Sequence, residues 1–550
     1  MTESRSFVYV KRIFLVIAAL FLLRLAFLQV FVHGEYTANA TEVRTIQYTT
    51  SPHRGTIYDR NGTVLAVSVD ATTIYANPTE VTNVDYEARK LASVLGGEQS
   101  EYEEALSKED TPFVYIKRQA DVDVADRVKE LDLDGIYFLS ESRREYPNGS
   151  IGGNVIGACD IDGNGICGLE LQYDEILRGT AGRYSAERGV RGAPIPGGVH
   201  EDTPAVDGED IIISIDITLQ DALERALEEG LEKYDEPRRG SAVVMDAETG
   251  EIHAMGSYPY LNPGNLADSM IGSDNLTPIT QSFEPGSVFK AFSALAVLQE
   301  GTLAPESELM VPAELQADEY VITDAHERED EVMTFSTILD NSSNVGISLA
   351  VDTVGFGKLS KVLSALKFSE PTGIDFPGED AGSLTEASQW SKIGGYNISF
   401  GQGLTATPLQ VVRAYGALAN EGIMVTPHFL LTKPQTNETP EYESEQVLFD
   451  QDAIDTLNSM LRGVVTNGTG TEAYIDGYEV VGKTSTAEIA ENGAYAEDRW
   501  NLCFSGFINN SSSKLVCNVT ANDVHYSSNV AGIFRDIMAE AIELYKIVPE

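Results

Sequence analysis

The feature of this chain with the clearest chemical potential is a serine followed three residues later by a lysine. On a helix this spacing places the hydroxyl and the amine on one face, where a buried, partly deprotonated lysine can activate the serine as a nucleophile. The pattern occurs three times, at Ser287/Lys290, Ser364/Lys367 and Ser511/Lys514. Only Ser287 follows Pro-Gly and opens a strongly amphipathic segment, so we expect Ser287 and Lys290 to be the catalytic pair.

A Ser-x-Asn triplet could supply the next parts of an acyl-transfer site, a hydroxyl that relays protons and an amide that holds the substrate. Three copies are present, at Ser273/Asn275, Ser342/Asn344 and Ser527/Asn529. The first precedes Ser287 and the last follows every other candidate element. Ser342 lies 55 residues after Ser287, and we therefore predict that this copy belongs to the site.

The third part is a lysine on a predicted edge strand. Residues 479–487 read Glu-Val-Val-Gly-Lys-Thr-Ser-Thr-Ala, and Lys483 lies 141 residues after Ser342. Lys483, Thr484, Ser485 and Thr486 would present a cation and hydroxyls to a substrate carboxylate. Each of the three motifs is common, but their occurrence in this order is not.

The elements that must position these residues form a domain that begins near residue 240. Residues 241–247 and 251–257 alternate around Glu-Thr-Gly and predict a hairpin, and residues 287–300 predict a buried helix. A second hairpin is predicted at about 502–520, followed by a helix over 532–546. Strands at both ends with helices between them indicate an antiparallel sheet covered by helices.

The preceding region, residues 41–236, has the mixed pattern of a separate α/β domain. Residues 57–58 and 64–66 flank an Asn-Gly pair, which is typical of a tight hairpin. Residues 209–216 predict a strand and 219–233 a helix, and the charged segment 233–239 predicts a linker. At 550 residues the chain is too long for a single core.

A twenty-residue apolar stretch at 13–32 is long enough to cross a bilayer as a helix. We predict an uncleaved, single-pass anchor in the cell membrane; a cleaved secretory signal ending near residues 38–40 (Ala-Asn-Ala) is the alternative. Arg5, Lys11 and Arg12 precede the stretch, so residues 1–12 are predicted to be cytoplasmic and the rest of the chain extracytoplasmic.

The charge of the chain excludes one class of partner. There are 85 acidic and 38 basic residues, which give a formal net charge of -47, so nucleic acid would be repelled. The acidic residues gather in runs, and we interpret these runs as solvated surface. The runs cover residues 98–104, 121–134, 318–331 and 441–445.

Four cysteines are compatible with an oxidising compartment. Cys159 and Cys167 flank a turn-rich segment, and Cys503 and Cys517 lie symmetrically about an Asn-Asn-Ser turn, so we predict two local disulfides. Four reduced, partly buried thiols are the alternative.

No metal or cofactor is expected. The seven histidines show no His-Glu-x-x-His or other paired spacing, and no Gly-x-Ser-x-Gly is present. The segment from Asp160 to Gly165 resembles a calcium loop, but its twelfth position is Leu171 instead of Glu, so we interpret it as a turn.

The ordered motifs, and longer segments around them, resemble the class B penicillin-binding proteins, the monofunctional transpeptidases. Residues 283–290 (Phe-Glu-Pro-Gly-Ser-Val-Phe-Lys) are similar to the active-site segment of that family, and residues 54–62 (Arg-Gly-Thr-Ile-Tyr-Asp-Arg-Asn-Gly) to its first N-terminal motif. Further segments match in family order: residues 144–147, 168–170, 246–250 and 401–403. The resemblance covers nearly the whole chain.

The resemblance implies an α+β architecture: a transmembrane helix (13–32), an elongated mixed α/β pedestal or dimerisation domain (41–236), and a penicillin-binding transpeptidase domain (240–550) whose antiparallel sheet packs between helices. It implies cross-linking of peptidoglycan stem peptides through an acyl-enzyme at Ser287, with inhibition by β-lactams. The implied partners are a membrane-embedded glycan polymerase and division or elongation proteins.

The resemblance also implies a role for each site residue. Lys290 would accept the Ser287 proton and Ser342 would relay protons. Asn344 would hold the donor amide, while Lys483 and Thr484 would bind the carboxylate. The backbone N–H groups of Ser287 and Thr486 would form the oxyanion hole.

One residue departs from the family pattern, because Ser485 stands where Lys-Thr-Gly is usual. Its hydroxymethyl group is expected to narrow the cleft or to alter β-lactam affinity. Two alternatives to the transpeptidase remain open: a D,D-carboxypeptidase or β-lactamase that passes the acyl group to water, and a weakly active scaffold of the cell-wall synthesis complex.

Overall fold

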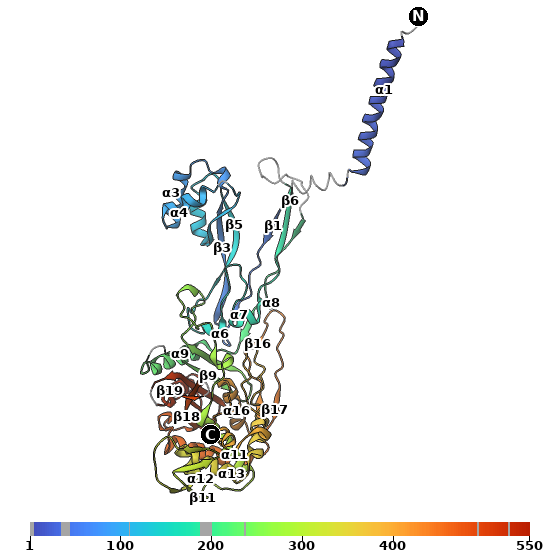
Figure 1. The fold of residues 1–550 in the computed structure, drawn as a ribbon. Coiled ribbons are helices and arrows are strands. Elements are labelled where there is room, and N and C mark those ends of the chain that lie inside the picture. Colours follow the sequence, from blue (N-terminus) through green and yellow to red (C-terminus); the bar gives the residue numbers. More distant parts are fainter. Residues whose placement is uncertain are drawn as a thin grey trace. The chain divides into compact units, whose positions relative to one another are not determined.

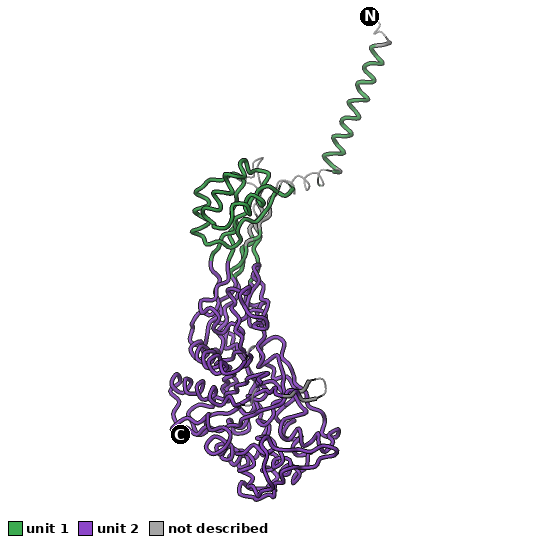
Figure 2. Tube along the Cα trace, turned by 60° about the vertical axis from the view of Figure 1, so that its left-hand side comes forward, with its two compact units in different colours: residues 1–53, 70–142, 179–207 green, residues 54–69, 143–178, 208–550 purple. Residues whose placement is uncertain are grey.

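The computed structural model describes residues 5–32, 34, 45–108, 110–187, 201–235, 238–491, 494–525 and 528–550. The chain forms two compact units (Figure 2). The first consists of residues 1–53, 70–142 and 179–207, and the second of residues 54–69, 143–178 and 208–550. Segments from the N-terminal half of the chain therefore belong to the same unit as the predicted site.

The N-terminal helix α1 (Arg5–Ala26) continues into a short π-helix (Phe27–Phe31) (Figure 1). Its 24-residue segment Phe7–Val30 is long and apolar enough to cross a membrane. Large apolar side chains such as Phe14 and Leu22 are exposed along it, which is the pattern of a helix that meets lipid. The predicted N-terminal membrane helix is therefore supported. Residues 38–40, the alternative cleavage site, lie outside the described residues.

The first unit contains two β structures and a small helical layer. β1 (Thr45–Thr50), β6 (Gly182–Glu187) and β7 (Glu201–Thr203) form an antiparallel sheet. The second half of β3 (Val64–Ala76) pairs with β4 (Val114–Ala120). Ile74 and Ala120 from these strands share a core with Leu91 and other residues of the neighbouring helices, α3 (Val84–Leu95), α4 (Gln99–Leu106) and α5 (Val122–Lys129).

The second unit begins with the predicted hairpin at residues 57–66. β2 (Ile57–Tyr58) pairs antiparallel with the start of β3, and Gly62 adopts the positive φ of 85° that the turn requires. β2 also pairs parallel with β8 (Ile211–Ile213), and β8 pairs antiparallel with β16 (Leu430–Thr432). This sheet thus joins three distant parts of the sequence.

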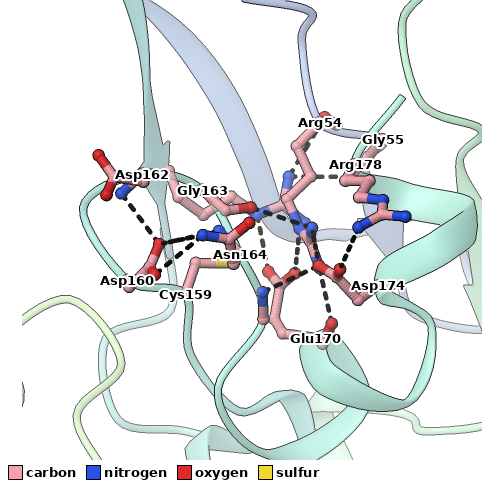
Figure 3. Close-up of polar contacts among 12 residues, drawn as sticks. Arg54, Gly55, Cys159, Asp160, Asp162, Gly163, Asn164, Glu170, Asp174 and Arg178 are labelled. Carbon is pink, nitrogen blue, oxygen red and sulfur yellow. Dashed lines mark hydrogen bonds and ion pairs between the residues drawn. The ribbon is translucent and has the colours of Figure 1, made fainter. Parts of the chain in front are cut away.

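A buried cluster of charges joins Arg54, three residues before β2, to a segment around Glu170 and Asp174 (Figure 3). The guanidinium of Arg54 donates to Glu170 Oε2 at 2.6 Å and to Asp174 Oδ1 at 2.7 Å. Arg144 Nε donates to Glu170 Oε1 at 2.7 Å. Burial alone would raise the pKa of Glu170, but Arg144 and Arg54 outweigh it and hold the pKa below its usual value. Glu170 is thus a carboxylate with no exposed surface, and both of its oxygens are bound.

The Asp160 segment beside this cluster is a turn, as predicted. Asp160 Oδ1 accepts hydrogen bonds from the backbone N–H groups of Asp162 and Asn164, both at 2.9 Å (Figure 3). The carboxylate is therefore used by the turn itself. Among the residues that the structure describes, no group of three or more His, Cys, Asp or Glu side chains could hold a metal ion.

The central sheet of the second unit is antiparallel, as predicted, and it has five strands. Its order is β10 (Ile252–Tyr258), β9 (Gly240–Asp246), β20 (Leu515–Val524), β19 (Ala494–Asn509) and β18 (Glu479–Glu491). Both predicted hairpins are present within it. β18 forms one edge of the sheet, which is where sequence analysis predicted the strand that carries Lys483.

Helices cover both faces of this sheet. α9 (Ile217–Leu231) and α18 (Ala531–Tyr545) share one core with Val244 and Phe504 of the sheet. The other core joins Val243 and Met245 to the helices α11 (Lys290–Gln299), α16 (Pro408–Ala419) and α17 (Gln451–Thr466). Smaller helices of this second layer are α12 (Phe335–Asp340), α13 (Asn344–Asp352), α14 (Phe356–Ala365) and α15 (Lys392–Ser399). The predicted α+β class with a sheet between helices is confirmed.

The prediction of two local disulfides is wrong for this structure, because all four cysteines are free. In the register of β19 and β20, Cys503 lies opposite Thr520 and Cys517 opposite Gly506. The two side chains also belong to cores on opposite faces of the sheet. Symmetry about a turn therefore did not bring the thiols together. The thiols of Cys159 and Cys167 are partly buried, and burial raises the pKa of Cys159 to about 12.

Replacement of Glu170 by Gln should destabilise the second unit strongly, since it removes the buried negative charge that Arg54 and Arg144 share and leaves Arg54 with Asp174 alone. The expected loss is about 3–5 kcal/mol of unfolding free energy at neutral pH. Because the folded-state pKa of Glu170 is depressed, its stabilisation is present above the usual carboxyl pKa of about 4.3 and is lost as pH falls through the lower folded value.

Urea unfolding followed by tryptophan fluorescence measures the unfolding free energy of the second unit, because both tryptophans, Trp390 and Trp500, lie in it. The matched control is Asp536→Asn, which removes the exposed Arg535–Asp536 pair of the same unit and should change stability little. Equal stability of the two variants would contradict a structural role for Glu170.

Candidate active site

Ser287 lies in a 3₁₀ turn, Gly286–Phe289, that leads directly into α11. Sequence analysis predicted one helix over residues 287–300, and the structure differs only in the tighter first turn. Buried apolar side chains such as Val288, Phe289 and Phe292 hold this turn and the helix in the core, while Ser287 itself is half-buried. The nucleophile candidate therefore stands on a rigid, packed support.

Lys290 is fully buried, and its ammonium nitrogen meets the Ser-x-Asn segment. Nζ donates to the backbone carbonyl and, at 3.1 Å, to the hydroxyl of Ser342, and it donates to Asn344 Oδ1 at 2.7 Å. Burial, reinforced by the positive charge of Lys483, lowers the pKa of Lys290 well below the usual lysine value. A neutral amine that can accept a proton is therefore more accessible here than in an exposed lysine.

The Ser342–Asn344 segment connects α12 to α13, and it has an unusual backbone conformation. Ser342 has a φ of 56°, in the left-handed region that residues other than glycine rarely adopt. This conformation lets both its carbonyl and its hydroxyl face Lys290. Of the two Ser-x-Asn copies that the structure describes in full, this is the one that meets Lys290.

Lys483 and Thr484 lie on the edge strand β18, and both side chains are buried. Burial lowers the pKa of Lys483 to about 7, although the nearby carboxylate of Asp340 opposes the shift. The hydroxyl of Thr484 is hydrogen-bonded to that of Thr469 at 2.5 Å. The edge strand β18 thus carries a buried cation and a hydroxyl held by Thr469.

Ser485 lies against the turn that carries Ser287, and its expected effect on the cleft and on β-lactam affinity stays a prediction. Its side chain is buried, with 2% of the residue exposed, and its hydroxyl lies beside Gly286. A Cβ atom on Gly286 would come within 2.4 Å of Ser485 Oγ, so glycine at 286 makes room for serine at 485. Within the described residues this hydroxyl has no hydrogen-bond partner.

A glycine segment that precedes α16 supports the Ser287 turn. The backbone N–H of Gly286 donates to the carbonyl of Gly401 at 2.9 Å, and the N–H of Gly403 donates to Glu284 Oε1 at 3.0 Å. A Cβ atom on Gly401 would meet the carbonyl oxygen of Gly286 at 2.1 Å. Residues 401–403 therefore fix the position of the turn through close backbone contact.

The remaining copies of the motifs have structural roles. Lys367 pairs with Glu445, and Lys514 donates to Asn420 Oδ1 at 2.9 Å. The carbonyl of Ser273 accepts a hydrogen bond from Asn154. Ser527 lies outside the described residues. Sequence analysis missed Thr469 and Asp340, which reach the site only through folding; the Gly-Thr-Gly at 468–470 was the one local signal.

The chain matches two family models. The model described as "Penicillin binding protein transpeptidase domain" matches residues 240–539, and "Penicillin-binding Protein dimerisation domain" matches residues 49–213. Among curated relatives, peptidoglycan D,D-transpeptidase FtsI of Escherichia coli is 31% identical over 98% of this chain and 91% of the relative. Stage V sporulation protein D of Bacillus subtilis is 30% identical over 96% of this chain and 83% of its own length.

Solved structures give the same result. Penicillin binding protein 3 of Mycobacterium tuberculosis, crystallised with aztreonam, is 26% identical with a TM-score of 0.70, over 91% of this chain and 98% of that one. A peptidoglycan synthetase of Bifidobacterium adolescentis is 26% identical with a TM-score of 0.72, over 92% and 98%. The chain belongs to the class B penicillin-binding proteins, and its C-terminal part is a penicillin-binding transpeptidase domain.

Replacement of Gly401 by Ala should destabilise the second unit by about 1–3 kcal/mol, because its φ of 84° and its contact with Gly286 leave no space for a methyl group. Gly357→Ala is the matched control, since that glycine lies in α14 with no atom within 4 Å of the added carbon. The control should be unchanged or slightly stabilised. Urea unfolding measures both, and a stable Gly401→Ala variant would argue against the close contact.

Proposed function

We propose that this chain is a serine D,D-transpeptidase that cross-links peptidoglycan stem peptides, with Ser287 as the acyl nucleophile. The observation that carries the proposal is the buried amine of Lys290, one turn from Ser287 and hydrogen-bonded to Ser342 and Asn344. Peptidoglycan as substrate and β-lactams as inhibitors follow from the family. The residue roles are our assignment.

In the first step, Lys290 in its neutral form accepts the proton of Ser287. Ser287 Oγ then bonds to the carbonyl carbon of the penultimate D-Ala, and the bond from that carbon to the nitrogen of the terminal D-Ala breaks. Ser342, in contact with Lys290 Nζ at 3.1 Å, relays the proton to the departing amine. The product of this step is an ester between Ser287 and the donor peptide.

The other groups bind and orient the donor. Lys483 in its cationic form and Thr484 bind the terminal carboxylate, and Asn344 holds the peptide amide. The backbone N–H groups of Ser287 and Thr486 stabilise the oxyanion, and loss of one such donor typically costs about 3 kcal/mol. Ser485 contributes only its backbone to this wall, since its side chain is buried against Gly286.

The second step transfers the acyl group to an amine of another stem peptide, which forms the cross-link and frees Ser287. A β-lactam would instead leave the serine acylated. We place the N-terminus in the cytoplasm and the enzyme outside, because basic residues such as Arg12 precede the apolar helix. The proposed domains are a cytoplasmic tail (1–12), a transmembrane anchor (13–32), a pedestal or dimerisation domain (41–236) and the transpeptidase domain (240–550). The proposed partners are a membrane-embedded glycan polymerase and division or elongation proteins.

Labelled penicillin should acylate the purified chain, and Ser287→Ala should abolish the covalent adduct. Ser364→Ala and Ser511→Ala are matched controls, since each removes the serine of another Ser-x-x-Lys pair, and both should be labelled like the unmodified chain. The adduct is detected by gel fluorescence and intact mass. Labelling that persists in Ser287→Ala would refute the assignment of the nucleophile.

A stem-peptide donor incubated with an amine acceptor should yield the cross-linked dimer. The comparison of dimer with free acid separates transpeptidation from hydrolysis, because water and the amine compete for the same acyl-enzyme. Release of free acid alone, at every acceptor concentration, would favour the carboxypeptidase or β-lactamase alternative. Absence of both products from an enzyme that penicillin acylates would favour the scaffold.

A further inference from the structure

Asp324 differs from the acidic residues that surround it in the sequence. Residues 318–331 were interpreted as solvated surface, and Glu327 and Glu329 are indeed exposed. The side chain of Asp324, in contrast, is only 11% exposed. It directly follows β13 (Tyr320–Thr323), which pairs with β12 (Glu314–Ala317). This position brings it to the Ser-x-Asn segment.

Three consecutive residues of that segment are held from this one strand end. The hydroxyl of Ser343 donates to Asp324 Oδ2 at 2.8 Å, and the backbone N–H of Val345 donates to Asp324 Oδ1 at 3.0 Å. Between them, Asn344 Nδ2 donates to the carbonyl of Thr323 at 3.1 Å. The orientation of the Asn344 amide, whose oxygen receives the Lys290 amine, is therefore set from β13.

Arg328 anchors Asp324 in turn. Its Nε donates to Asp324 Oδ2 at 2.7 Å, while its two terminal nitrogens donate to the carbonyls of Val311 and Pro312 at 2.9 and 2.8 Å. Val311 ends the strand β11 (Glu308–Val311). A guanidinium with this many acceptors has little freedom, so the carboxylate is held in a fixed place.

The charge of Asp324 also acts on Lys290. Burial raises the pKa of Asp324, but its bonds from Val345, Arg328 and Ser343 outweigh this and lower it, so the group stays ionised. The charged groups that act on Lys290 are Lys483, from β18, and Asp324, from β13; Asp340 acts on Lys483. Asp324 favours the protonated amine, whereas Lys483 and burial favour the neutral one.

We propose that Asp324 is a positioning residue for the transpeptidase reaction: it holds the Ser342–Asn344 segment in place and supplies the counter-charge that Lys290 faces. The inference rests on the proposed function, because it assumes that Lys290 activates Ser287. It assigns a role in the reaction to the segment that connects β13 to β14 (Glu331–Thr334), which carries no catalytic motif.

The test is the second-order rate constant for acylation of the full-length protein by labelled penicillin, measured across pH. At high pH this rate constant reaches a plateau, which should be roughly ten- to hundredfold lower in Asp324→Asn. A side-chain amide cannot accept hydrogen bonds at both of its terminal atoms, and the charge-assisted bonds are lost. The limb of the pH profile, where the rate constant rises toward the plateau, should also move to lower pH, since loss of the negative charge favours the neutral form of Lys290. A role in folding alone would not move the limb.

Two further variants separate the parts of the proposal. Ser343→Ala removes the bond to Asp324 and the capping bond from the Gly346 N–H, and it keeps the charge of Asp324, so the plateau should fall while the limb stays in place; this variant also tests the claim if Asp324→Asn does not fold. Glu327→Gln removes an exposed charge of the same segment and should match the unmodified protein.

The proposal is overturned if Asp324→Asn has the plateau of Glu327→Gln, if its limb does not move, or if Ser343→Ala acylates at the unmodified rate. Failure of the unmodified protein to be acylated at Ser287 would instead overturn the proposed function, and this inference with it.

Discussion

The burial of two lysine amines in one site is the constraint on which the rest of this active site depends. Lys290 and Lys483 are both fully buried, and an ammonium group removed from water is costly unless it is compensated. Each has a nearby carboxylate, Asp324 for Lys290 and Asp340 for Lys483. The electrostatic surroundings of the two amines differ, because the positive charge of Lys483 also acts on Lys290. Both burial and a like charge favour the neutral form of Lys290, whereas burial alone lowers the pKa of Lys483, to about 7, so we assign the proton-accepting role to Lys290 and the anion-binding role to Lys483.

This arrangement of charges requires that the Ser287 turn, the Ser342–Asn344 segment and the strand β18 have closely defined positions. The Ser287 turn is held against β18 by the contact of Gly286 with Ser485, and against residues 401–403 by a backbone hydrogen bond. The Ser342–Asn344 segment is held from β13. Thr469 fixes the hydroxyl of Thr484 on β18. These contacts are made by small side chains and backbone groups, which have few conformations to lose, and they provide the preorganisation that an acyl-transfer site needs.

The sequence predicted the order of the motifs, the hairpins and the edge strand, because these follow from local periodicity and turn residues. It could not predict which acidic residue of 318–331 would be buried, since Ser343 and Val345, which bind Asp324 together with the nearby Arg328, lie about twenty residues away. The place of Ser485 was also hidden, because it depends on the approach of a strand to a turn nearly 200 residues earlier. The cysteines show the same limit: hairpin register, which a symmetric spacing does not reveal, put Cys503 and Cys517 on opposite faces of the sheet.

The central claim is that burial beside Lys483 makes Lys290 the base that activates Ser287. The most direct test is the pH dependence of the acylation of the unmodified protein by labelled penicillin. The same pH profile is measured for Asp340→Asn, because this variant should shift the rising part of the profile only if that part reports the titration of Lys483. The account predicts that acylation rises with pH and levels off far below about 10.4, the ordinary pKa of a lysine. A limb that is still rising near that value would mean that Lys290 keeps its proton in the folded enzyme, and would contradict the account.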